Sequence, residues 1–195
     1  MPELQNFMSK EGFIRTYDLL DALSNDVNTA YKVLEDNKQN QYFRRCVVRA
    51  IFSYVEAVIE TVKVEVRSSL RLERPCFELS KKEGELLGSL SVISEEKGRQ
   101  FPLEQNLKST FKLAAKVWDL DYRLQTDSED YRDFVIAKSF RNKLTHPKTY
   151  YDIEVTDDDM HYHTIAGMWV RAEFERLMKA RFDGLEVYIK KYMVT

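Results

Sequence analysis

The sequence predicts an all-α protein, a single-domain helical bundle with two long helices. Three observations lead to this prediction. The 195-residue chain contains only 6 Gly and 4 Pro, too few turn residues for an all-β fold. Apolar side chains recur at steps of three and four residues, which is the period of an amphipathic helix. Hydrophobic residues make up 44% of the chain, and its length suits one domain over residues 1–195.

Two long helices are predicted in the first half of the chain. The first spans residues 12–36, and its apolar side chains share one face: Phe13, Tyr17, Leu20, Leu23, Val27, Tyr31 and Leu34. The second spans residues 39–72 and is apolar nearly all round between residues 46 and 62, as a central helix is. Its polar residues form one stripe, the polar stripe: Arg45, Arg49, Ser53, Glu56, Glu60, Lys63 and Arg67. This stripe fits a solvated face, a functional site or a dimer interface.

The middle of the chain, residues 72–101, has the weakest pattern. Ser80 and Glu83 match a capping box, in which each side chain bonds to the backbone N–H of the other residue. This box predicts a short helix after Ser80. Pro102 suits the first turn of a further helix, over residues 103–122, because proline has no N–H to leave unsatisfied there.

Two more helices are predicted towards the C-terminus. Residues 126–129 (Thr-Asp-Ser-Glu) match a second capping box and open a helix that runs to His146. Pro147 ends this helix, since the residue before proline is pushed out of the α region. An irregular loop over residues 148–155 follows. The last helix, residues 156–192, starts with a capping threonine and three aspartates that favour the positive end of the helix dipole.

Composition narrows the classes of function. The net charge is -2, so no global basic field exists, and any contact with nucleic acid requires a local patch. Two cysteines, Cys46 and Cys76, make neither a disulfide framework nor a metal-binding spacing. Residues 1–6 lack the features of a signal peptide, and no apolar run is long enough to span a bilayer. We therefore expect a cytoplasmic protein that does not enter a membrane.

The segment Ser139–Pro147 is the strongest candidate for chemistry. It places Arg141 and His146 five residues apart at the end of a helix. Five residues turn a helix by about 500°, so the two side chains share a face only if His146 leaves helical geometry, which Pro147 favours. Asn142 and His146 are four residues apart and can face the same way.

An arginine and a histidine suit phosphoryl transfer on RNA. Histidine has an ordinary pKa of about 6.5 and can take or give protons near neutrality. Arginine stays charged and forks onto phosphate oxygens. RNA brings its own nucleophile, the 2′-hydroxyl, so this chemistry requires no metal, cofactor or nucleophilic side chain.

The motif resembles the signature of the HEPN superfamily. Arg141, Asn142 and His146 match its Arg-x-x-x-x-His pattern, and a long central helix with an acidic residue, Glu56, precedes it. The resemblance implies an all-α, often dimeric protein and a metal-independent endoribonuclease, in a toxin–antitoxin, phage-defence or RNA-processing system. Arg141 and His146 would be catalytic, with Asn142 and Glu56 supporting them. Lys148 stands where one toxin subgroup has tyrosine, so membership of that subgroup does not follow.

The resemblance also implies partners. A homodimer is expected, with RNA and an antitoxin or other protein as further partners. Lys138, Lys143 and Lys148 are the candidate RNA-binding residues. Other members of the superfamily have lost catalysis, so a non-catalytic dimerisation or binding module is the alternative. Without the resemblance, Arg141 and His146 would simply complement the dipole at a helix end.

Several other polar and aromatic residues have two interpretations. His161 and His163 lie two residues apart on a helix and point to different sides, so we expect a solvated first turn and no metal site. Tyr150, Tyr151 and Tyr162 suit either stacking on nucleobases or half-buried packing with a wet hydroxyl.

Overall fold

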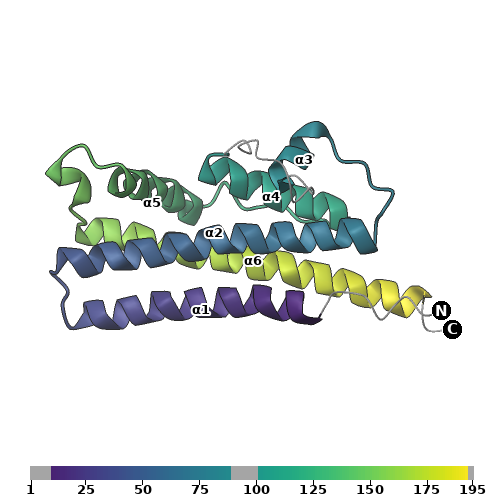
Figure 1. Ribbon diagram of the computed structural model, residues 1–195, viewed down its shortest axis with the longest axis horizontal. Coiled ribbons are helices and arrows are strands. Elements are labelled where there is room, and N and C mark those ends of the chain that lie inside the picture. The colour runs from purple at the N-terminus through teal and green to yellow at the C-terminus, as the bar shows by residue number, and fades with distance from the viewer. Residues whose placement is uncertain (1–9, 89–100, 193–195) are drawn as a thin grey trace. The chain divides into compact units, whose positions relative to one another are not determined.

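The computed structural model describes residues 10–88 and 101–192, and the side chains of residues 17–88 and 101–184. These residues form α-helices and one 3₁₀ turn, with no β-strand among them (Figure 1). The elements follow in this order: α1 (Lys10–Glu35), α2 (Gln41–Leu72), α3 (Lys81–Leu87), α4 (Leu103–Trp118), α5 (Glu129–Thr145), η2 (Tyr150–Ile153) and α6 (Asp157–Tyr192). The prediction of an all-α helical bundle is confirmed, and α2 and α6 are its two longest helices, with 32 and 36 residues.

Side-chain caps fix the start of two helices where the sequence predicted them. Thr156 Oγ1 accepts a hydrogen bond from Asp159 N at 3.1 Å, and the Asp159 carboxylate accepts one from Thr156 N at 2.8 Å. This reciprocal pair satisfies two backbone N–H groups that have no partner within α6. Ser80 and Glu83 form the capping box of α3 in the same way. Much of the remaining weak segment, residues 89–100, lies outside the described residues.

The capping box predicted at residues 126–129 is wrong. The N-cap of α5 is Ser128, whose hydroxyl accepts a hydrogen bond from Tyr131 N at 3.2 Å, so the helix starts at Glu129. The irregular loop predicted over residues 148–155 also differs from the structure, because part of it forms the 3₁₀ turn η2. In addition, α4 ends at Trp118, before the predicted end at residue 122. The next residue, Asp119, adopts a left-handed φ of 56°.

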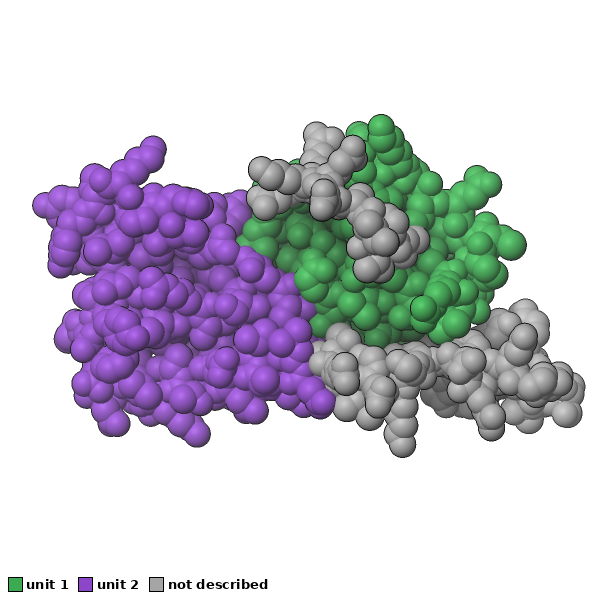
Figure 2. Space-filling view, viewed as in Figure 1, with its two compact units in different colours: residues 1–7, 59–124, 173–195 green, residues 8–58, 125–172 purple. Residues whose placement is uncertain are grey.

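The chain divides into two compact units (Figure 2). Unit 1 comprises Met1–Phe7, Ile59–Leu124 and Glu173–Thr195, and unit 2 comprises Met8–Val58 and Gln125–Ala172. The helices α2 and α6 each contribute residues to both units. All the candidate site residues predicted above belong to unit 2.

Unit 1 combines α3, α4 and the C-terminal parts of α2 and α6, and it contains a buried polar cluster. Arg181 forms an ion pair with Glu65 at 2.5 Å, and both side chains are buried. The guanidinium carbon of Arg181 lies 4.3 Å from the centroid of the Trp118 ring. Trp118 Nε1 in turn donates to Ser69 Oγ at 2.9 Å. This cluster connects α2, α4 and α6 within the unit.

Unit 2 combines α1, α5, η2 and the N-terminal parts of α2 and α6. Phe134 on α5 packs against Trp169 on α6, with ring centroids 5.2 Å apart. At Gly167 the backbone of α6 comes so near α2 that an added Cβ would lie 3.2 Å from Ile51 Cγ2. Four helices contribute buried apolar side chains, which include Leu20, Leu34, Val47, Val48, Ile51, Phe52, Val55, Phe134, Ala137, Ala166 and Val170.

The polar stripe of α2 is solvated only in its middle. The exposed members are Arg49, Ser53, Glu56 and Glu60. Towards the start of α2, Arg45 Nη1 donates to the Ile153 carbonyl at 3.0 Å. Towards its end, Lys63 is only 7% exposed and pairs with Glu60 at 2.8 Å. The four middle residues therefore form a solvated face, whereas Arg45 and Lys63 beyond them make intramolecular contacts.

Two further observations concern membrane-spanning helices and the cysteines. No helix within the described ranges is long and apolar enough to cross a bilayer. Cys46 is half-buried, Cys76 is exposed, and both are free thiols.

Candidate active site

Arg141 sits on α5 and forms an ion pair with Glu56 on α2. Its guanidinium carbon also lies 5.9 Å from the centroid of the Phe52 ring. Asn142 Oδ1 is 3.5 Å from Arg141 Nη1, at the long limit of a hydrogen bond. The side chain of Arg141 is 28% exposed and that of Glu56 49% exposed. Both predicted supporting residues therefore touch the arginine, which keeps contact with solvent.

His146 is the C-cap of α5 and leaves helical geometry, with φ -131° and ψ 61°. Its backbone N still donates to the Asn142 carbonyl at 3.1 Å. The residue is exposed, and within the described chain its imidazole has no hydrogen-bond partner. An exposed imidazole with both nitrogens free can exchange protons with a bound substrate.

Arg141 and His146 form no polar contact with each other within the described part of the chain. Among the described residues, no hydrogen bond or ion pair joins the two side chains, and neither borders the pocket described below. Arg141 is held from α2 while His146 projects from the end of α5. A phosphate that contacts both residues therefore has to bridge them.

The three candidate RNA-binding lysines occupy different surroundings. Lys143 is exposed, with its ammonium 4.8 Å from the centroid of the Phe140 ring. Lys148 is exposed, and its backbone N donates to Asp152 Oδ2 at 2.9 Å. Lys138 is half-buried and has an interaction partner. Two of the three ammonium groups are thus presented to solvent near the end of α5.

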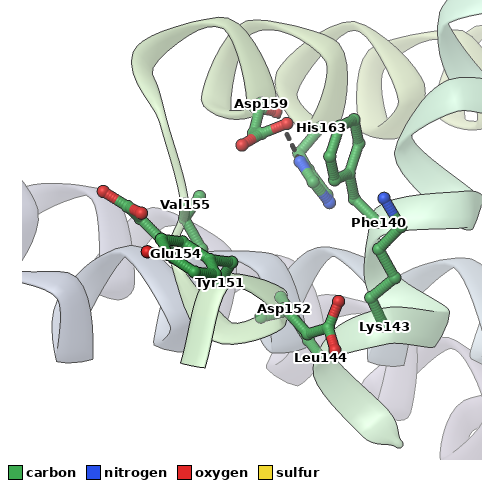
Figure 3. Close-up of a pocket in the computed structure, with 9 residues that line it drawn as sticks. All are labelled: Phe140, Lys143, Leu144, Tyr151, Asp152, Glu154, Val155, Asp159 and His163. Carbon is green, nitrogen blue, oxygen red and sulfur yellow. Dashed lines mark hydrogen bonds between the residues drawn. The ribbon is translucent and has the colours of Figure 1, made fainter. Parts of the chain in front are cut away.

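A small pocket of about 30 Å³ lies between the end of α5, η2 and the first turns of α6 (Figure 3). Its lining includes Phe140, Lys143, Tyr151, Asp152 and His163. This volume holds about one water-sized group.

Comparisons with known proteins add nothing to this geometry. The chain matches no protein-family model, no curated protein and no solved structure. The HEPN resemblance therefore depends on the motif residues Arg141, Asn142 and His146, on Glu56 and on the order of the helices. In the described ranges, no group of three or more His, Cys, Asp or Glu side chains is placed to hold a metal ion.

His163 is fully buried, which corrects the expectation of a solvated first turn for both histidines; His161 is exposed. His163 Nδ1 bonds to the Asp159 carbonyl. Because a carbonyl only accepts, Nδ1 carries the proton and Nε2 is left as an acceptor. Burial lowers the pKa of His163, although the bond to Asp159 opposes this effect, so the neutral ring is favoured.

The remaining nitrogen of His163 has no hydrogen-bond partner among the described residues, although it is buried. In Figure 3 it points away from Asp159, towards the space between Lys143 and Tyr151. A buried polar atom without a partner costs about 1–3 kcal/mol. Such an atom beside a pocket marks a place where a small donor group can bind.

The turn η2 is fixed to α2 by side chains that the sequence did not single out. Arg44 Nη1 donates to the Val155 carbonyl at 2.8 Å, and Gln41 exchanges two hydrogen bonds with the Val155 backbone at 2.8 and 3.0 Å. Asp152 accepts bonds from the backbone N–H groups of Lys148 and Thr149, which lowers the pKa of its carboxyl. These contacts attach the segment after His146 to the start of α2 and cap it internally.

Proposed function

We propose that the protein is a metal-independent endoribonuclease of the HEPN type. The observation that carries this proposal is the ion pair between Glu56 and Arg141. Arg141 lies about one and a half helical turns before His146, an exposed histidine with no hydrogen-bond partner for its ring among the described residues. The central helix thus orients a phosphate-binding cation on α5, the helix that ends at an exposed histidine. Neither residue type alone suggests a nuclease, but their combination supplies both parts of the reaction.

Arg141 binds the scissile phosphate in this mechanism. The Glu56 carboxylate contacts Nη2, which leaves other N–H groups of the guanidinium for phosphate oxygens. Because both partners of this ion pair are partly exposed, their interaction is worth only about 0–1 kcal/mol. A phosphate can therefore share the guanidinium while Glu56 keeps it oriented. The positive charge stabilises the negative charge that develops on the phosphate oxygens.

His146 moves the proton. The RNA 2′-hydroxyl attacks the adjacent phosphorus, the bond to the 5′-oxygen breaks, and a 2′,3′-cyclic phosphate and a 5′-hydroxyl form. His146 either takes the proton of the 2′-hydroxyl or donates one to the departing oxygen, and water completes the other transfer. Asn142, at the side of Arg141, helps to orient the guanidinium.

The test is cleavage of single-stranded RNA in EDTA by the wild type and three variants. His146→Ala and Arg141→Ala should each lose about 10²- to 10⁴-fold in rate while remaining folded. His161→Ala removes an exposed histidine of the same unit and should cleave like the wild type. Full activity of His146→Ala, or activity that requires added metal, would refute the mechanism.

One observation favours a second function, a non-catalytic helical binding module. Among the described residues, Arg141 and His146 share no hydrogen bond, and neither lines the pocket, whereas an assembled catalytic pair would converge on a cleft. Absence of cleavage on every RNA tested, together with retained RNA or protein binding, would support this module.

We propose that the protein forms a homodimer with α5 near the interface, whichever of the two functions it has. This proposal derives from the resemblance and from the exposed middle of the polar stripe. Light scattering at tens of micromolar should give twice the chain mass of 23.1 kDa. A monomer mass under these conditions would rule out the homodimer. RNA and an antitoxin-like protein are the other proposed partners.

A further inference from the structure

Two aromatic rings are presented to solvent on η2. Tyr150 is 72% exposed and Tyr151 80% exposed, and their centroids are 6.3 Å apart in an edge-to-face arrangement. Exposure of a ring alone does not mark a binding site, so each ring has to be judged by what lies beside it. An unpaired nucleobase can stack on one exposed aromatic ring.

The turn that carries these rings is anchored to α2. Arg45 donates to the Ile153 carbonyl at the end of the turn, Gln41 and Arg44 hold Val155 two residues further on, and Asp152 caps the turn from within. A ring on an anchored turn loses little freedom when a ligand stacks on it, so more of the stacking energy appears as affinity. This distinguishes Tyr151 from an exposed tyrosine on a loose loop.

Only one of the two rings borders the pocket. Tyr151 lines it, together with Lys143 and the fully buried His163, while Tyr150 does not. His163 Nε2 has no partner among the described residues and points towards this space (Figure 3). A base stacked on Tyr151 can direct one small group from its edge into a pocket of about 30 Å³.

The surrounding charge suits an RNA strand. Lys143 forms one wall of the pocket, and its flexible side chain can swing aside to admit a base edge and then contact a phosphate. Lys148 is exposed close to η2 in sequence. Both ammonium groups belong to the same unit as Arg141 and His146.

We propose that Tyr151 and the pocket beside it form a subsite for one unpaired base of an RNA strand. The base stacks on the Tyr151 ring, its edge faces the pocket, and the neighbouring phosphates lie near Lys143 and Lys148. The subsite selects unpaired RNA because a base in a duplex cannot expose its face to the ring. This inference rests on the proposed function for its class of ligand, RNA.

Binding is measured by fluorescence anisotropy, with a labelled single-stranded RNA and the His146→Ala variant as the parent protein. Tyr151→Ala should weaken binding about 5- to 150-fold, the range of stacking losses on alanine substitution, while Tyr151→Phe keeps the affinity. Tyr150→Ala is the matched control, of the same residue type on the same turn, and should change binding less than threefold. Duplex RNA of the same sequence should bind more weakly and respond less to Tyr151→Ala.

Equal losses in Tyr150→Ala and Tyr151→Ala, equal loss on duplex RNA, or no RNA binding by the parent would each overturn the subsite. The result is independent of catalysis because the parent lacks His146. Loss of binding in Tyr151→Ala without cleavage by the wild type would leave the subsite standing and refute the nuclease. Cleavage by the wild type with full binding by Tyr151→Ala would refute the subsite and leave the nuclease standing.

Discussion

The Glu56 carboxylate on α2 pairs with the Arg141 guanidinium on α5, and the guanidinium also lies over the Phe52 ring. Two residues from distant parts of the sequence thus meet at the motif that suggested a nuclease. Since the pair is partly exposed, it contributes little to stability. Its value in the proposed mechanism is to orient the arginine.

Removal of Glu56 tests this positioning role. Glu56→Ala should lower kcat for RNA cleavage about 10- to 100-fold, because a misplaced phosphate-binding group loses much of its effect. Glu56→Gln, which keeps an oxygen acceptor, should recover part of the rate. The free energy of unfolding should change by less than about 1 kcal/mol. Ser53→Ala, also exposed on the polar stripe, is the control, and unchanged kcat in Glu56→Ala would exclude a positioning role.

Unlike the exposed pair of Glu56 and Arg141, the buried ion pair of Arg181 and Glu65 should matter for stability. Glu65→Gln removes the charge that pairs with the buried guanidinium, which then keeps longer contacts to Ser69 at 3.2 Å and to Glu73 at 3.5 Å. Breaking a buried ion pair costs about 3–5 kcal/mol, which urea unfolding should show. Glu104→Gln breaks the exposed pair with Lys108 in the same unit and should cost about 0.3–0.5 kcal/mol. Similar losses in both variants would contradict the buried environment of Glu65.

His163 should make stability depend on pH. Its pKa is lowered in the folded protein, so the unfolded chain takes up a proton first as the pH falls. The contribution of His163 is therefore complete above about pH 6.5 and is lost as the pH decreases below that value, by at most about 1.4 kcal/mol per pH unit. Urea unfolding at pH 7.5 and 5.5 should show a smaller pH effect in His163→Gln than in the wild type. His161→Gln should keep the wild-type dependence; an unchanged dependence in His163→Gln would contradict this assignment.

The helices were largely predictable because their signals are local. Thr156 and Ser80 each have the partner three residues on that a capping box requires, and both caps are present. At the start of α5 two capping residues compete, and only Ser128 accepts the backbone hydrogen bond. Which of the two residues becomes the N-cap depends on where the chain enters the helix, and the sequence motif does not specify that point.

The candidate site was only partly predictable. Glu56 was singled out by the family resemblance, as the acidic residue of the central helix, whereas the residues of α2 that anchor the segment after η2 act over more than a hundred residues and leave no local signal. The burial of His163 did have a signal. His163, Ala166 and Val170 lie at steps of three and four and form one buried face of α6.

In the proposed mechanism the RNA substrate supplies the nucleophile, its own 2′-hydroxyl. The most direct measurement is mass spectrometry of the ends produced in EDTA from an RNA oligonucleotide and from its all-deoxy counterpart of the same sequence. We predict a 2′,3′-cyclic phosphate and a 5′-hydroxyl from the RNA, no cleavage of the deoxy strand, and neither product with His146→Ala. Cleavage of the deoxy strand, or 5′-phosphate ends on the RNA, would contradict the mechanism.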